Sequence, residues 1–137
     1  MSRVINADSP GKRRNAARRT IAEILRHLIH KRELDDETKD MAAALVLNLQ
    51  EIADTVETTT AAWEKRDYYL KADRFRLEWE WVDPTACHLQ SLILEGRWEE
   101  LPQALVKLAP HFADIRIAKM TRAPSAWRGS YELLLKK

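Results

Sequence analysis

Two pairs of carboxylates have the spacing that ligands of a divalent cation would have on a helix. Glu37 and Asp40 stand three residues apart, and so do Glu51 and Asp54. Carboxylate oxygens are ligands that Mg²⁺ prefers. No glycine or proline separates the pairs, so we expect them on one helix, where Asp40 and Glu51 would lie about 16 Å apart. Carboxylates that far apart cannot share one ion with ligand distances of about 2.1 Å.

These acidic pairs resemble the paired motifs with which the all-α nucleoside triphosphate pyrophosphohydrolases hold Mg²⁺. In that family the two motifs sit on facing helices, whereas here the segment MAAALVLNLQ joins them without a helix breaker. The resemblance covers four residues and departs from the family in geometry. It implies a magnesium-dependent pyrophosphohydrolase, which is the least favoured of the three functions that the sequence suggests.

The histidines and the single cysteine offer little for catalysis. Glu23, His27 and His30 would share one helix face and are of the types that bind zinc, but a polar rim beside a basic helix explains them better. Cys87-His88 is one adjacent pair with no second pair at ligand spacing. The sequence contains neither a phosphate-binding glycine loop nor a nucleophile motif. We therefore predict that the protein is not an enzyme and uses no metal or cofactor.

Basic side chains gather at both ends of the chain, whereas the middle is acidic. Arginine outnumbers lysine in the first cluster, which suits phosphate because the planar guanidinium group presents several donors. We predict salt-sensitive contacts with the backbone of nucleic acid, without recognition of base sequence; a solvated basic arm is the alternative. The candidate nucleic-acid-binding residues are Lys12, Arg13, Arg14, Arg18, Arg19, Arg26, Lys119, Arg122 and Arg128.

The function predicted first is that of a small, non-enzymatic accessory subunit that binds RNA or DNA and docks on a larger complex. Small basic helical subunits occur, as a class, in CRISPR effector complexes and as partners of reverse transcriptases, although no motif here matches either. The alternative is a helical protein-interaction or scaffold module without a nucleic-acid role. Residues 35–57 are acidic and the ends are basic, so copies of the chain could associate head to tail.

The helix signals predict an all-α fold. Pro10 after a capping residue begins a helix that runs to about Lys31, and Asp35 begins the next. An uninterrupted helix from Asp35 to Val82 would be about 72 Å long, too long for a compact domain with a radius of gyration of about 14 Å. We therefore expect a bend near residues 58–60, where three β-branched threonines weaken the helix.

Proline and glycine mark the elements that follow. Asp83-Pro84 predicts a helix that Gly96 ends, Leu101-Pro102 predicts another through Ala109, and a short final helix spans residues 127–135. The whole chain, residues 1–137, is thus predicted to be a single-domain bundle of four to five helices with a long central helix. Residues 1–10 are expected to form a flexible basic arm.

The segment 63–82 is both aromatic and charged. On one helix, Trp63, Leu70, Leu77 and Trp81 would form one apolar stripe, and Tyr68, Ala72, Phe75, Trp79 and Val82 a second on the opposite side. Two stripes predict two packing partners. We favour core packing within the chain on both sides; a second chain, or bases stacked on the aromatic rings, are the alternatives. The candidate protein-interface residues are Trp63, Tyr68, Tyr69, Phe75 and Trp79.

Composition limits where the protein is expected to work. Hydrophobic residues make up 45% of the 137 residues and charged residues 32%, as in ordinary soluble domains. No apolar run approaches the roughly 20 residues of a membrane helix, and the first residues lack the apolar core of a secretory signal. Because Cys87 is the single cysteine, no internal disulfide can form. These features predict a cytoplasmic protein without a membrane partner.

Overall fold

The two longest helices each begin at a residue that accepts a hydrogen bond from the first turn. The computed structural model describes residues 9–136. Ser9 caps α1 (Pro10–Ile29) by accepting from the Lys12 N–H at 3.3 Å. Asp35 caps α2 (Asp36–Glu64) by accepting from the Thr38 N–H at 2.8 Å. The predicted starts of both helices are confirmed. The predicted arm of residues 1–10 lies outside the described residues except for Ser9 and Pro10.

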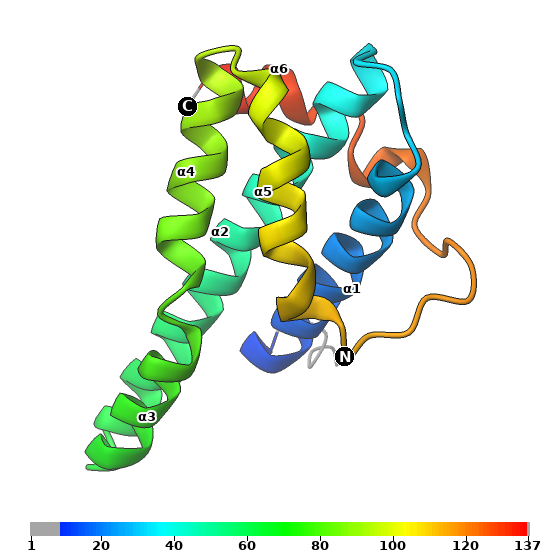
Figure 1. The fold of residues 1–137 in the computed structure, drawn as a ribbon. Coiled ribbons are helices and arrows are strands. Elements are labelled where there is room, and N and C mark those ends of the chain that lie inside the picture. The colour runs from blue at the N-terminus through cyan, green and yellow to red at the C-terminus, as the bar shows by residue number, and fades with distance from the viewer. Residues whose placement is uncertain (1–8, 137) are drawn as a thin grey trace.

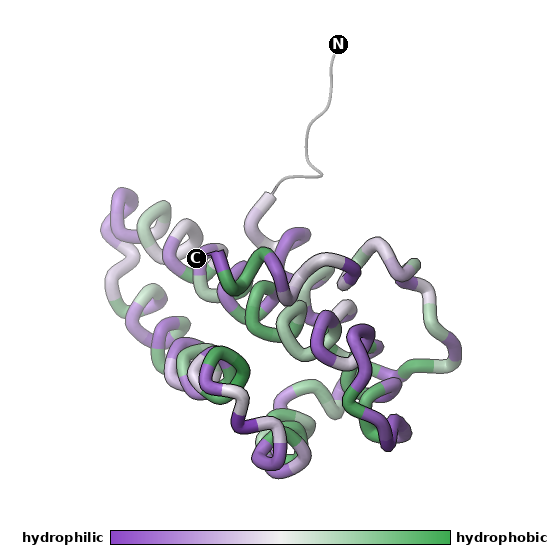
Figure 2. Tube along the Cα trace, turned by 90° about the horizontal axis from the view of Figure 1, so that it is seen from above, coloured by the Kyte–Doolittle hydropathy of each residue, from purple (hydrophilic) through white to green (hydrophobic). Residues whose placement is uncertain are grey.

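The second helix is the element around which the others assemble (Figure 1). It packs against α1, α3 (Tyr69–Trp79), α4 (Val82–Leu94) and α6 (Ser130–Leu135). Leu45, Leu49 and Ile52 of α2 are fully buried, because this helix has neighbours on several sides. Apolar and polar residues alternate along the helices (Figure 2), as expected when one face of each helix meets the core. The predicted all-α bundle with a long central helix is confirmed.

The helix bend predicted near residues 58–60 is not found there. The second helix continues through these threonines to Glu64. The hydroxyls of Thr58 and Thr60 each donate to a carbonyl oxygen one turn earlier in the helix, at 3.0 and 2.9 Å, so the β-branched residues fit within it. The chain instead reverses at residues 65–68, where Asp67 adopts a φ of 63°. No glycine or proline marks this turn, so no local signal predicted it.

The segment 63–82 is therefore not one helix. The end of α2, the turn at 65–68, α3 and the start of α4 share it, with Glu80 and Trp81 between the two later helices. Figure 1 shows α3 and α4 following one another along α2. Only one of the two predicted apolar stripes packs inward: Ala72 and Val82 are buried, whereas Leu70 and Leu77 are 63% and 65% exposed. The prediction of core packing on both sides is wrong.

The last third of the chain has shorter helices and is partly irregular. Gly96, with a φ of 69°, follows α4, and the 3₁₀ turn Trp98–Glu100 leads into α5 (Leu101–Leu108) and a second 3₁₀ turn, Ala109–Phe112. An irregular stretch with turns and bends then runs to the 3₁₀ turn Pro124–Ala126 and to α6. Trp127, predicted to begin the final helix, is buried just before it. Along residues 9–136, no helix is long and apolar enough to cross a membrane.

The left-handed residue at the α2–α3 turn allows a test of the fold. Asp67 holds a conformation that costs about 1–2 kcal/mol for most L-residues. We expect Asp67→Gly to raise the free energy of unfolding by about 0.5–1 kcal/mol, because glycine has no Cβ to strain. Chemical denaturation measures this change. Arg66→Gly, one residue earlier on the same exposed turn, is the control: it should destabilise the protein, and stabilisation by both variants would contradict the assignment.

Candidate nucleic-acid interface

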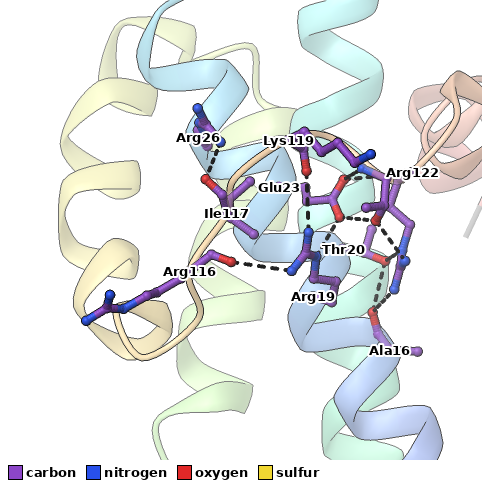
Figure 3. Close-up of polar contacts among 10 residues, drawn as sticks. Ala16, Arg19, Thr20, Glu23, Arg26, Arg116, Ile117, Lys119 and Arg122 are labelled. Carbon is purple, nitrogen blue, oxygen red and sulfur yellow. Dashed lines mark hydrogen bonds and ion pairs between the residues drawn. The ribbon is translucent and has the colours of Figure 1, made fainter.

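One face of α1 carries basic residues at helical spacing. Lys12, Arg19, Glu23 and Arg26 follow at intervals of seven, four and three residues, which places them on the same side of the helix. The irregular segment 115–122, from the far end of the chain, lies along this side (Figure 3). The site is therefore built from α1 and from the irregular segment 115–122, which we call the strap.

Glu23 is the residue that holds the strap. Its side chain is fully buried and accepts hydrogen bonds from Arg19 Nε at 2.6 Å, from the backbone N–H of Thr121 at 2.6 Å and from that of Arg122 at 2.9 Å. The Thr121 hydroxyl donates to it as well. Burial raises the pKa of the carboxyl, but these donors outweigh it and lower the pKa from 4.5 to about 2. Glu23 is therefore a buried carboxylate whose ionised form is held by four hydrogen bonds.

Arginine side chains fasten the rest of the strap through its backbone. Arg19 donates to the carbonyl oxygens of Arg116 and Lys119, at 3.4 Å each, and Arg26 donates to the carbonyl of Ile117. In the opposite direction, Arg122 donates to Thr20 Oγ1 at 3.0 Å and to the Ala16 carbonyl at 3.2 Å. These carbonyl and hydroxyl acceptors are neutral, so the bonds fix the guanidinium groups in place without cancelling their charge.

The two basic ends of the chain thus meet on one surface, which we call the basic face. Near the start of α1 it includes Arg13, which forms an ion pair with Glu51 through two hydrogen bonds of 2.7 and 3.0 Å. Glu51 offsets the charge of Arg13, and Glu23 offsets that of Arg19, whereas Arg26 and Arg122 donate to neutral atoms. The residues of the basic face are Lys12, Arg13, Arg19, Arg26, Arg116, Lys119 and Arg122.

Three of the predicted nucleic-acid-binding residues lie elsewhere. Arg14 points toward α3: it donates to Thr55 at 3.2 Å, stands over the Phe75 ring at 4.8 Å, and burial lowers its pKa. Arg18 binds Asp114 at 2.6 Å and the carbonyl of His111. Arg128 is exposed beside Gly129, whose N–H donates to Asp40 near the start of α2. The first two arginines contribute to packing more than to a charged surface.

Sequence reasoning missed two members of the site. Arg116 was not among the predicted residues, and Glu23 appeared only as part of a polar rim. The spacing of Lys12, Arg19, Glu23 and Arg26 could have grouped these four on one helix face. Nothing local could have shown that the strap covers this face, because its contacts with α1 join residues about one hundred positions apart, such as Glu23 and Thr121.

The predicted acidic motifs do not form a cluster in the structure. Both pairs lie on the single helix α2, as expected from the absence of a breaker. Lys31 binds Glu37 at 3.1 Å, Arg13 binds Glu51, and Asp40 accepts hydrogen bonds from the N–H groups of Gly129 and Tyr131. Within residues 9–136, no group of three or more histidine, cysteine, aspartate or glutamate residues could hold a metal ion.

The predicted interface aromatics divide into two groups. Trp63 packs edge-on against Phe75 with ring centres 5.1 Å apart, and Phe75 lies 6.1 Å from Trp79; these rings are half-buried. Tyr68 and Tyr69, at the turn and the start of α3, are 51% and 57% exposed. They line an open hollow of about 820 Å³. Tyr68 and Tyr69 therefore lie at the turn of the α2–α3 hairpin, whereas the other three rings form a row along it that reaches Arg14 of α1.

The buried carboxylate predicts a large loss of stability in one variant. We expect Glu23→Gln to lower the free energy of unfolding by about 3 kcal/mol, because the shift of its pKa from 4.5 to about 2 corresponds to that difference between protonation states. Urea denaturation measures the loss, and amide exchange of residues 115–122 should accelerate in parallel. Glu99→Gln, an exposed position, is the control. A loss below about 1 kcal/mol would contradict the role of Glu23.

The same carboxylate predicts the direction of the pH dependence. Its pKa is lower in the folded than in the unfolded chain, so its contribution is complete above about pH 4.5 and is lost as the pH falls toward 2. The difference in unfolding free energy between the wild-type protein and Glu23→Gln should therefore be constant from neutral pH to about pH 5 and then shrink. A difference that stays constant down to pH 2 would show that the charge of Glu23 is not responsible.

No protein-family model, curated protein or solved structure matches the chain. Inference about function therefore rests on the residues of the chain itself, and the feature that stands out among them is the basic face formed by α1 and the strap.

Proposed function

We propose that the chain is a non-enzymatic accessory protein that binds the phosphate backbone of RNA or DNA through the basic face. The observation that carries this proposal is the meeting of the two basic ends of the chain along α1. Cations separated by about one hundred residues become neighbours, while the carboxylates among them, Glu23 and Glu51, are already bound to arginines. A linear polyanion can contact such a surface at several points together.

The fixed positions of the arginines favour this kind of binding. A guanidinium group has five N–H donors, so Arg26 and Arg122 can bind the strap or α1 on one side and still present donors and charge to a phosphate. Because the internal hydrogen bonds already restrict these side chains, less conformational entropy is lost on binding. Lys12, Arg116 and Lys119 have exposed side chains that can adapt to the spacing of phosphates. Contacts of this type are insensitive to base sequence.

A second candidate function is a protein-interaction module without a nucleic-acid role. The observation that favours it is an open groove of about 790 Å³ between the end of α1 and α5, lined mainly by apolar residues. Ile29, Leu34 and Val106 beside it are 61%, 49% and 71% exposed. Apolar surface of this kind often marks an interaction site. The two functions are compatible, because an accessory subunit would bind both nucleic acid and a larger protein.

A gel-shift assay with a salt titration tests the proposal. The wild-type protein should retard single- or double-stranded nucleic acid at about 50 mM salt and release it in moderate salt, with a log–log slope of about −3 to −5 if four or five phosphates are neutralised. The triple variant Lys12→Glu, Arg116→Glu and Lys119→Glu should bind at least about tenfold more weakly. Its side chains are exposed, and no hydrogen bond or ion pair joins them to other described side chains, so the fold should persist.

A matched variant separates the basic face from net charge. Lys65→Glu, Lys107→Glu and Lys136→Glu change the net charge by the same amount, and these exposed lysines belong to the end of α2, to α5 and to the end of α6, not to α1 or the strap. This control should retain most of the binding. Equal losses in both triple variants would show that only the overall charge matters. Absence of retardation by the wild-type protein at low salt would refute the proposal and leave the protein-interaction module as the better account.

A further inference from the structure

The cations of the basic face are spread across α1 as well as along it. Lys12, Arg19 and Arg26 follow one another on the helix, with about 21 Å from the first to the last. The strap passes over this side of α1, so that the side chain of Arg116 points away on one side and that of Arg122 lies on the other (Figure 3). Charges distributed over the width of a surface can contact two strands of phosphates together.

The strap also keeps α1 out of the grooves of a duplex. A helix that reads the major groove presents an uncovered side to the base edges. Here Arg19 and Arg26 donate to carbonyl oxygens of the strap, and Glu23 is fully buried where the strap passes over the helix. The exposed surface is therefore broad, and it suits contacts with phosphates on the outside of the nucleic acid.

The large exposed aromatic rings belong to another part of the molecule. Among residues 9–136, the exposed side chains of tyrosine, tryptophan and phenylalanine are those of Tyr68 and Tyr69, at the turn between α2 and α3. Proteins that bind single strands without regard to sequence combine cations with several rings on which successive bases stack. The imidazole of His30 lies in the hollow beside Arg26 and Lys119, but one small ring cannot stack successive bases. Unpaired bases therefore add little to binding at the basic face.

A duplex is also the stronger electrostatic partner for this surface. The distance from Lys12 to Arg26, about 21 Å, corresponds to about six base pairs and about twelve phosphates, because two strands run side by side. Each phosphate that is neutralised also releases more counterions from a duplex than from a single strand, with salt slopes of about 0.9 and 0.7 per phosphate. Without stacked bases to compensate, the single strand should bind more weakly.

We propose that the basic face binds double-stranded nucleic acid in preference to single strands. This inference rests on the proposed function, because it specifies the class of ligand that the same site binds. The first helix lies along the outside of the duplex over about six base pairs, and Arg116 and Arg122 contact phosphates of different strands. Duplex DNA and duplex RNA share this chemistry, so the experiment includes both.

Paired and unpaired forms of the same strands test the proposal. The probes are oligothymidylate of about 20 residues and its duplex with oligodeoxyadenylate, and oligouridylate and its duplex with oligoadenylate. At about 50 mM salt, the wild-type protein should bind a duplex at least about tenfold more tightly than the matching single strand. This preference in the DNA pair, the RNA pair or both supports the proposal and identifies the duplex.

Two negative results have different meanings. Single strands that bind as tightly as the duplexes, or more tightly, would overturn the preference for duplexes and leave the proposed function intact. Absence of binding to all four probes would refute the proposed function, and this inference with it.

Variants separate contacts with two strands from stacking of bases. Arg116→Gln should reduce the salt slope of duplex binding by about one and leave that of the single strand nearly unchanged; equal reductions would overturn the two-strand arrangement. The triple variant Tyr68→Ala, Tyr69→Ala and His30→Ala should bind every probe within about twofold of wild type, whereas a loss of single-strand binding beyond about fivefold would show that stacking contributes. Lys107→Gln, at an exposed position of α5, is the control and should change neither slope.

Discussion

A carboxylate inside a protein is stable only when its oxygens are hydrogen-bonded. In this chain the buried carboxylate is that of Glu23 in α1, and the strap, about one hundred residues away in the sequence, provides several of its hydrogen-bond donors. Glu23 lies on the side of α1 that faces the strap, and its side chain is fully buried there. The strap supplies the Thr121 and Arg122 N–H groups and the Thr121 hydroxyl, and α1 supplies Arg19. The irregular path of the strap follows from this arrangement, since backbone N–H groups that point at Glu23 cannot be engaged in a helix of their own.

The arginines around Glu23 have a structural task and leave a charged surface behind. Arg26 binds a carbonyl oxygen of the strap, and Arg122 binds the Ala16 carbonyl and the Thr20 hydroxyl of α1. These neutral acceptors hold the two side chains without cancelling their charge, whereas the charge of Arg19 is offset by Glu23. A cluster of basic residues in a sequence can therefore indicate internal fastening and a surface for anions together. Arg14 and Arg18, in contrast, add little to a charged surface. Arg14 packs against Phe75, and Arg18 forms an ion pair with Asp114.

The fold could be predicted where its signals are local. The capping residues Ser9 and Asp35 correctly predicted where α1 and α2 begin, and Gly96 correctly predicted where α4 ends. Each of these signals affects only the few residues around it. The reversal at Asp67 could not be predicted, because aspartate enters the left-handed region only occasionally. The convergence of the basic ends was equally hidden, since Glu23 and Thr121 are 98 residues apart. Periodicity assigned residues to helix faces but could not show which faces would be covered.

The contacts between α1 and the strap also affect the order in which parts of the protein can fold during synthesis. The first helix leaves the ribosome well before the residues that complete it, because chains are made at about 5–20 residues per second. Until Thr121 and Arg122 emerge, Glu23 needs water as its partner, so this side of α1 stays hydrated although its opposite, apolar side can already pack against α2. Contacts of such long range are slow to form. The contacts of α1 are therefore completed only after the helices that follow it in the chain have been made.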